Sequence, residues 1–356
     1  MKWFCLLVLA LGFVPVSLRA RETNGAAAGY KQSKGPFEIG TVENEWLDQK
    51  RSRKVPVKTY FPKSGAGPFP VIIFSHGLGG TREGYEYLGR HWASHGYVSV
   101  HVQHIGSDSA VWSEGRLDQL MRNMEKAAAS MENITNRPLD VSFAINQMEK
   151  LNREDSALKD RLDLSRVGVA GHSFGAFTTM AIAGEVFVAP GGRQITFTDP
   201  RVKAAIPMST PVNRSWPGLN TGFEHINIPC LHMTGTRDAS PIGRTLPEDR
   251  RVPYDLSKGA DKFLVTFQGG DHMIFSGRGR MRGDEKDELF QKYIRESSTA
   301  FWDGYLKGDR AAKKWLVDGG FKAVLGTDGE FEEKIASNQS SSSSTARARQ
   351  ESHDSK

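Results

Sequence analysis

The sequence predicts an α/β fold, a mostly parallel central sheet with helices on both faces. Two observations carry this prediction. Short apolar runs such as Val71–Phe74 have the length of buried strands, and segments such as Phe174–Gly184 that follow such runs have helical spacing. Strands that alternate with helices in this way form parallel sheets. The chain of 356 residues is long enough for one such domain of about 250 to 300 residues with tails.

The elements are expected in a regular order. Alternating segments around Phe37–Trp46 and Val55–Phe61 flank a polar stretch and predict a β-hairpin. The later strands are predicted at Val71–Phe74, Tyr97–Val102, Val167–Ala170, Val202–Met208, Cys230–Gly235 and Phe263–Phe267. The helices are predicted at Thr81–Ser94, from Pro138 onward, at Phe174–Gly184 and at Asp284–Leu306. Proline suits the first turn of a helix, so Pro138 is expected to open one.

The ends of the chain differ in composition from its middle. Residues 1–20, with an early Lys2 and an apolar run, predict a signal peptide, although cleavage among Ala26–Ala28 or an uncleaved anchor are alternatives. We expect residues 21–36 to be a lead-in linker, 37–330 the α/β domain, and 331–356 a disordered polar tail or surface attachment. The predicted protein is secreted or periplasmic, without stable membrane insertion after the leader is removed.

The charge balance argues against a nucleic-acid partner. The formal charge is +6, and it falls to +4 once Lys2 and Arg19 of the predicted leader are left out. Acidic and basic residues are interspersed, and no basic stripe is interleaved with aromatic residues. We therefore expect a small-molecule or polymeric substrate, and the sequence leaves the oligomeric state open.

A pattern of five residues suggests a catalytic nucleophile. Gly171-His172-Ser173-Phe174-Gly175 follows a predicted strand and opens a predicted helix rich in small residues. This is the context of a nucleophile elbow, in which flanking glycines make room for a strained serine. The pattern predicts Ser173 as a nucleophile; a glycine-rich turn with an N-capping serine is the structural alternative.

A serine nucleophile requires a base and an orienting acid at the ends of later strands. Asp238 follows the strand Cys230–Gly235, and His272 follows the strand Phe263–Phe267. The order Ser, Asp, His matches that of this fold. Asp271 is an alternative acid, but neighbours in an extended loop point apart, and His172 is expected to point away from the hydroxyl.

Two backbone amides are expected to stabilise an oxyanion. One is that of Phe174, directly after the nucleophile, and the other lies in the glycine-rich turn Ser75–Gly80. Within this turn we expect the amide of Leu78, with that of Gly77 as the alternative. His76 is expected to support the loop.

These motifs resemble those of a known group of enzymes. His76-Gly-Leu-Gly-Gly80 together with the motif around Ser173 is similar to the platelet-activating factor acetylhydrolase and dienelactone-hydrolase-like branch of the α/β-hydrolases, over about Val55 to Leu316. Supporting pieces are Arg137-Pro-Leu-Asp140-Val and Phe301–Leu306. The resemblance implies the α/β-hydrolase fold and an esterase.

This sequence differs from that group of enzymes at positions that bear on the expected substrate. Dienelactone hydrolases carry a Cys nucleophile where Ser173 stands, and the lipid acetylhydrolases take their acid from the loop that here holds Ser209 and Thr210. The placement of Asp238 is similar to that in cutinase-like polyester hydrolases. Those enzymes have a substrate-stacking Trp near the position of Pro211, for which Trp216 is a substitute in principle.

The sequence thus predicts a serine-dependent carboxylic ester hydrolase that forms an acyl-enzyme, needs no metal or organic cofactor, and acts on short-acyl or accessible esters. The excursion Val186–Thr198 is short, so no large lid is expected. The alternatives are an acyltransferase that uses the same triad, a polyester hydrolase of the cutinase type and a non-catalytic binding module. Trp112 and Trp216 are expected either in the pocket wall or in the core.

Overall fold

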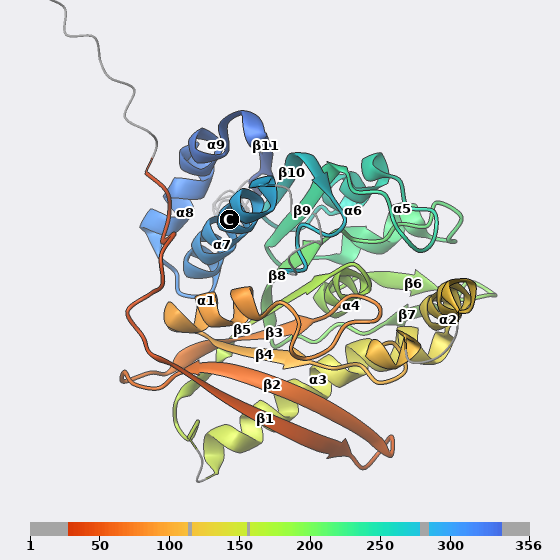
Figure 1. Ribbon diagram of the computed structural model, residues 1–356, viewed down its shortest axis with the longest axis horizontal. Helices are drawn as coiled ribbons and strands as arrows, with labels where there is room; N and C mark the ends of the chain where they lie inside the picture. Colours follow the sequence, from red (N-terminus) through yellow and green to blue (C-terminus); the bar gives the residue numbers. More distant parts are fainter. Residues whose placement is uncertain (1–27, 113–115, 155–156, 278–284, 337–356) are drawn as a thin grey trace, which may run out of the picture.

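A single sheet of nine strands organises the molecule. The computed structural model describes residues 28–112, 116–154, 157–277 and 285–336, and within them the strand order is β1-β2-β4-β3-β5-β8-β9-β10-β11. The bounds are β1 Ile39–Asp48, β2 Arg53–Pro62, β3 Phe69–Ser75, β4 Val98–Val102, β5 Leu162–His172, β8 Val202–Met208, β9 Cys230–Arg237, β10 Lys262–Asp271 and β11 Gly329–Lys334. Figure 1 shows the β1–β2 hairpin at one edge and β11 at the other.

The strands from β4 to β10 run parallel to one another, and the antiparallel pairs lie toward the two edges. The pairs β4–β3, β3–β5, β5–β8, β8–β9 and β9–β10 are parallel, and the pairs β1–β2, β2–β4 and β10–β11 are antiparallel. This arrangement confirms the mostly parallel sheet and the hairpin that the sequence predicts, and it agrees with the α/β-hydrolase fold.

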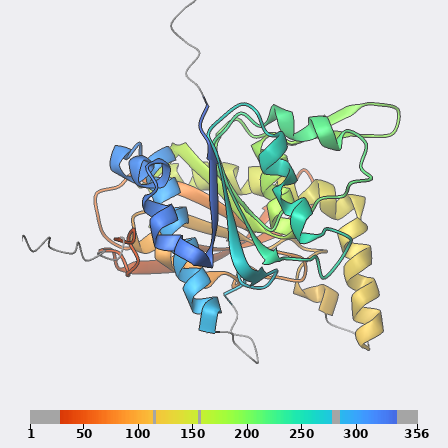
Figure 2. The ribbon, with the colours of Figure 1, turned by 90° about the horizontal axis from the view of Figure 1, so that it is seen from above.

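Helices cover both faces of the sheet. Their bounds are α1 Glu86–Ser94, α2 Leu117–Ala129, α3 Met131–Arg153, α4 Phe174–Ala183, α5 Leu219–Gly222, α6 Val252–Leu256, α7 Glu285–Tyr305, α8 Arg310–Val317 and α9 Gly320–Leu325. Figure 2 shows the blue helices α7, α8 and α9 on the opposite side of the molecule from the yellow helix α2.

Two apolar layers form the core, one on each face. Along β3, Ile72 and Phe74 join the layer that includes Trp92 of α1 and Trp302 of α7. Their neighbours Val71 and Ile73 join the layer of α3 and α4, with Val141, Ile145 and Met180. Because successive strand side chains point to opposite faces, the uninterrupted apolar run of β3 marks a strand buried on both sides.

The prediction that Pro138 opens a helix is wrong. Helix α3 begins at Met131 and contains Pro138 in its interior, and the side chain of Ser130 caps its first turn by accepting from the amide of Asn133 at 3.3 Å. An interior proline costs about 3 kcal/mol because its ring lacks an N–H and crowds the preceding turn. Packing of residues such as Val141 and Ile145 beyond it offsets that cost.

The other differences occur where the local apolar pattern is weak. Helix α1 begins at Glu86 rather than Thr81 because Tyr85 has a left-handed φ of 60°. The sequence does not predict α2, of which only Met124 and Ala127 are buried. The charged edge strand β11 extends to Lys334, beyond residue 330, where the sequence places the end of the domain; of its side chains only that of Phe331 is buried.

None of the helices in the described ranges combines the length and apolarity that a membrane span requires. The predicted signal peptide and residues 337–356 of the predicted tail lie outside the described residues.

Candidate active site

Ser173 lies in the tight turn between β5 and α4. Its backbone has φ 56° and ψ −119°, a conformation that costs a non-glycine residue about 1–3 kcal/mol. The flanking glycines make this turn possible. A Cβ on Gly171 would lie 2.4 Å from the carbonyl oxygen of Gly175, and one on Gly175 would lie 1.9 Å from that of Ser75. The local sequence therefore dictates the strained elbow that presents the serine hydroxyl.

His272 and Asp238 reach Ser173 from neighbouring parallel strands. Asp238 follows β9 and His272 follows β10. Both residues therefore lie beyond the carboxyl ends of the parallel strands, where β5 also ends. Nε2 of His272 lies 2.9 Å from Oγ of Ser173, and its Nδ1 lies 2.7 Å from Oδ1 of Asp238. A carboxylate accepts only, so Nδ1 carries the proton and Nε2 is free to accept one from the hydroxyl.

The carboxylate of Asp238 is fully buried and held by further groups. Ser209 and Thr234 donate to Oδ2 at 2.5 and 2.9 Å. Nη2 of Arg250 lies 3.4 Å from Oδ1, and the same guanidinium donates to the backbone oxygens of Asp238 and Ser209. These contacts were not predictable from the sequence, because Arg250 lies in a short 3₁₀-helix (Pro247–Arg251) that matches no motif.

The predicted oxyanion amides are available for a ligand. Phe174 is the first residue of α4, where an N–H has no acceptor within the helix. Leu78 lies in the turn after β3, and its amide donates to no acceptor among the residues that the structure describes. The amide of Gly77, the alternative, lies 3.4 Å from the hydroxyl of Tyr85. Of the two amides, only that of Leu78 lacks an acceptor among the described residues, and its role as the second donor stays a prediction.

A cavity of about 1430 Å³ opens beside the serine. Ser173, His272 and Leu78 lie in its wall, together with Trp112 and Trp216. Ligand pockets usually measure about 300–1,000 Å³, so this one has room for much more than an acetyl group. Both tryptophans are thus pocket residues rather than core.

An aromatic wall extends from the predicted oxyanion site into this cavity. The ring of Phe177 lies 5.7 Å from that of Phe174, 5.4 Å from that of Phe187 and 6.2 Å from that of Trp216, measured between centroids. Phe187 comes from the ribbon of β6 (Val186–Val188) and β7 (Gln194–Thr196), which forms the short excursion after α4. This wall is suited to an apolar part of a ligand.

Glu185, at the end of α4, is a buried acid in the cavity wall. Its side chain is 5% exposed, and its carboxyl has no hydrogen-bond or ion-pair partner among the described residues. Burial raises the pKa of this carboxyl from 4.5 to about 8. Its position and its protonated state near neutral pH were not predictable, since Glu185 follows a mostly apolar helix and matches no motif.

The alternatives considered from the sequence have other hydrogen-bond partners. The carboxylate of Asp271 accepts from the amide of Met273 at 2.8 Å. Nδ1 of His172 lies 2.7 Å from the hydroxyl of Tyr85, and burial keeps the pKa of this histidine well below its usual value. Across the described ranges, no group of three acidic, histidine or cysteine side chains is arranged to hold a metal ion.

Part of the chain matches a known protein family. Residues 38–189 match the family described as "Platelet-activating factor acetylhydrolase, isoform II". The matched region contains the turn with Leu78 and the elbow with Ser173. Asp238 and His272 lie beyond its end.

Comparison with individual proteins extends the similarity along the chain. A platelet-activating factor acetylhydrolase of Cavia porcellus is 30% identical over 306 residues, which cover 75% of this chain and 65% of that protein. Cutinase 1 of Thermobifida cellulosilytica is 26% identical over 251 residues, or 68% of this chain and 78% of that protein. Cutinase cut1 of Thermobifida fusca is 23% identical over 342 residues, or 92% and 89% of the two chains.

Proposed function

We propose that this chain, which has the α/β-hydrolase fold and is similar to platelet-activating factor acetylhydrolases and cutinases, hydrolyses carboxylic esters through an acyl-enzyme on Ser173. The observation that carries the proposal is the unbroken hydrogen-bonded series from Ser173 through His272 to Asp238. Such a series activates a hydroxyl that is otherwise a poor nucleophile.

The residues divide the acylation step among them. Oγ of Ser173 forms a bond to the ester carbonyl carbon while Nε2 of His272 takes the hydroxyl proton. Asp238 orients the imidazole and stabilises its positive charge. As the tetrahedral intermediate collapses, the bond to the alcohol oxygen breaks and His272 returns the proton to that oxygen.

Deacylation repeats the sequence with water. His272 removes a proton from a water molecule, the hydroxide oxygen attacks the acyl carbon, and the bond to Oγ breaks with return of the proton to Ser173. In both steps the amides of Phe174 and Leu78 donate to the oxyanion, whose charge exists in the intermediate but not in the substrate. Donors aimed at that charge lower the barrier selectively.

The cavity supports esters with an apolar portion. The aromatic wall around Phe177 and Phe187 begins next to the oxyanion amide of Phe174, so an acyl or alcohol group bound there lies close to the reacting carbon. The names of the related proteins, acetylhydrolase and cutinase, are in keeping with short-acyl and with accessible esters respectively. We propose this range of substrates, and export of the protein as its residues 1–20 suggest.

The experiment is turnover of p-nitrophenyl acetate by Ser173→Ala. We expect at least about a 10⁴-fold loss of kcat with an unchanged fold, since the acyl-enzyme can no longer form. Ser165→Ala, an exposed serine on the same strand, is the matched control and should keep full activity. Mass spectrometry of rapidly quenched wild-type enzyme should show one acetyl group on the peptide that contains Ser173. Full activity of Ser173→Ala, or an acetyl group elsewhere, contradicts the proposal.

A further inference from the structure

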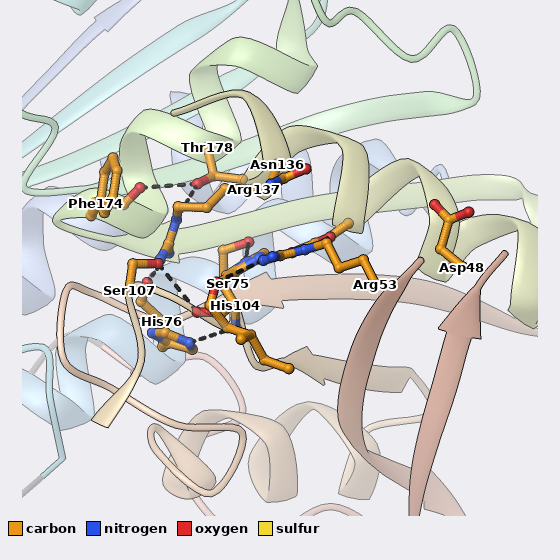
Figure 3. Close-up of polar contacts among 12 residues, drawn as sticks. Asp48, Arg53, Ser75, His76, His104, Ser107, Asn136, Arg137, Phe174 and Thr178 are labelled. Carbon is orange, nitrogen blue, oxygen red and sulfur yellow. Dashed lines mark hydrogen bonds and ion pairs between the residues drawn. The ribbon is translucent and has the colours of Figure 1, made fainter. Parts of the chain in front are cut away.

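Helix α3 carries a buried arginine that the proposed mechanism does not use. We propose that Arg137 is a positioning residue that holds both amide donors of the oxyanion site, those of Leu78 and Phe174, in place at once. This inference rests on the proposed function. It starts from the position of Arg137 between the turn after β3 and the start of α4, which Figure 3 shows.

The guanidinium donates to both segments and also to the loop after β4. On the turn side, Nη2 donates to the carbonyl oxygen of His76, and Nη1 donates at 2.8 Å to Oγ of Ser107 in the loop after β4. Toward the helix, Nε donates to Oγ1 of Thr178 at 2.9 Å. Arg137 therefore links two segments that the chain separates by about a hundred residues (Figure 3).

On the turn side, the contacts determine the direction of the Leu78 amide. The carbonyl of Gly77 accepts from the amide of Gly80 at 3.0 Å and lies 2.6 Å from Nδ1 of His76. The peptide between Gly77 and Leu78 is trans, so the N–H of Leu78 points away from that carbonyl. Arg137 holds the preceding carbonyl, that of His76, and so prevents this backbone from rotating.

Ser107 fixes the same turn from a second side. Its hydroxyl accepts from Arg137, and its backbone carbonyl accepts from the amide of Gly79 at 2.9 Å. His76, directly before Gly77, thus bonds to Arg137. Gly79, directly after Leu78, is linked to the same guanidinium through Ser107.

On the helix side, Arg137 contacts the residue that provides the other amide. Its guanidinium carbon lies 4.5 Å from the centroid of the Phe174 ring, within the range of a cation–π interaction. Thr178, which accepts from Arg137, donates in turn to the carbonyl oxygen of Phe174 at 3.0 Å. Arg137 therefore contacts the ring of Phe174 directly and is linked to its carbonyl through Thr178.

The cost of burying Arg137 argues that it does more than fill space. The residue is 0% exposed, and no carboxylate lies within ion-pair distance of it among the described residues. The nearby Asp140 pairs with Arg51, Arg53 and His104 instead. Burial lowers the pKa of Arg137 to about 9. Burying an unpaired charge costs desolvation free energy, and apolar packing would join two segments without that cost.

The experiment compares Arg137→Met and Arg137→Lys with the wild-type protein. We expect Arg137→Met to lower kcat on p-nitrophenyl acetate by about 10- to 100-fold and to leave KM within about threefold, because oxyanion donors act in the transition state. A trifluoromethyl ketone, which forms a tetrahedral adduct with an oxyanion, should lose affinity by a similar factor. Arg137→Lys keeps the charge but not the fork of donors, and should restore only part of kcat.

Arg201→Met is the matched control. Arg201 contacts the other part of α3, through Asn146 and Glu149, and lies outside the cavity wall. It should leave kcat and inhibitor affinity unchanged. Each kcat is calculated per active site, and the active sites are counted by titration with a fluorophosphonate. A smaller amount of folded enzyme then does not lower the measured kcat. Equal kcat in Arg137→Met and wild type, or a loss of kcat without loss of ketone affinity, overturns the inference.

Two milder variants cover the case in which Arg137→Met does not fold. Ser107→Ala and Thr178→Val each remove one partner of Arg137, on the turn side and on the helix side respectively. Each should lower kcat about 3- to 10-fold with KM preserved; if neither does, the inference is wrong. Failure of the proposed function is distinguishable, because it requires that Ser173→Ala remain active.

Discussion

Ser209 directly follows β8, the neighbour of the strand that leads to Asp238. In this structure its hydroxyl donates to Oδ2 of Asp238 at 2.5 Å, while Oδ1 of Asp238 lies 2.7 Å from His272. The ends of β8 and β9 therefore both lie on the Nδ1 side of the His272 imidazole. We expect an acid at either location to lie near the imidazole, because parallel strands bring their carboxyl ends to the same end of the sheet.

Asp238→Asn should lower kcat about 10³- to 10⁴-fold on p-nitrophenyl acetate with little change in fold, since the amide leaves the imidazole in the wrong tautomer. Asp271→Asn, the neighbouring acid, is the control and should keep its rate within about threefold. Adding Ser209→Asp to Asp238→Asn should recover at least about tenfold of the lost rate. A fully active Asp238→Asn would show that the acid lies elsewhere.

Glu185 makes stability depend on pH. Its carboxyl has a pKa of about 8 in the folded protein against 4.5 as usual, so the folded state keeps a proton that the unfolded state releases. The free energy of unfolding therefore falls as the pH rises from about 4.5 to 8. The fall is at most about 1.4 kcal/mol for each unit by which the folded and unfolded pKa values differ. A neutral amide at this position does not carry that penalty.

Glu185→Gln should therefore raise Tm relative to the wild-type protein, and by more at about pH 8 than at about pH 5. Thermal unfolding followed by circular dichroism at both values measures the difference. Glu154→Gln, an exposed acid after α3, should give the same small effect at both. A gain that is equal at the two pH values, or larger at pH 5, contradicts a proton held by Glu185.

At the scale of elements, the ribbon β6–β7 and helix α2 form much of the cavity wall. The ribbon contributes Phe187, whose ring lies 6.4 Å from that of Trp216, and α2 contributes Met121 and Met124. These elements lie outside the strands that lead to Ser173, Asp238 and His272, so they shape the pocket without altering the elbow. The wall is the part of the molecule that we expect to determine which esters bind.

Phe187→Ala should reduce the preference for larger apolar esters. Removing one ring from the wall should lower kcat/KM for p-nitrophenyl octanoate about tenfold relative to that for the acetate, because an apolar group that fits a hydrophobic pocket contributes about 1–3 kcal/mol to discrimination between substrates. Leu47→Ala, an exposed large-to-small change on β1, should leave the ratio unaltered. An unchanged octanoate-to-acetate ratio in Phe187→Ala would exclude this wall as the site of acyl binding.

At the scale of the whole molecule, the proposed triad and the turn with Leu78 all lie at the carboxyl end of the parallel strands. The turn with Leu78 follows β3, Ser173 follows β5, Ser209 follows β8, and Asp238 and His272 follow β9 and β10. The two apolar layers hold these strands in register, so the positions of the side chains depend on the core rather than on the loops. A rigid sheet is therefore what brings residues 99 positions apart within hydrogen-bonding distance.

Asp140 adds a polar connection across the molecule. It pairs with Arg51 and Arg53 of the hairpin, at 2.8 and 2.9 Å, and with His104, whose other ring nitrogen lies 3.1 Å from Oγ of Ser75. Burial lowers the pKa of His104 to about 3, so this histidine is neutral and Nδ1 donates to the carboxylate. The edge hairpin, α3 and the end of β3 are thus joined through one carboxylate.

The strands around the site were predictable from the sequence because their information is local. An apolar run such as that of β3 is buried on both faces whichever partners it meets, and the glycines beside Ser173 are required by the turn itself. Helices α2 and α3 were not predicted correctly for the opposite reason. Met131 is exposed and Pro138 disfavours a helix, so only packing against the sheet maintains α3 through both.

The sequence by itself determined the alternation of strands and helices, the elbow at Ser173 and the order in which Asp238 and His272 follow it, since each depends on residues close together in the chain. Only the tertiary structure decided that Ser209 and Arg250 hold Asp238, that Glu185 is buried in the cavity wall and that Arg137 links His76 to Thr178. Long polar side chains bond to partners that are distant in the sequence. Neither the spacing of motifs nor the periodicity of apolar residues predicts which partner lies within hydrogen-bonding distance.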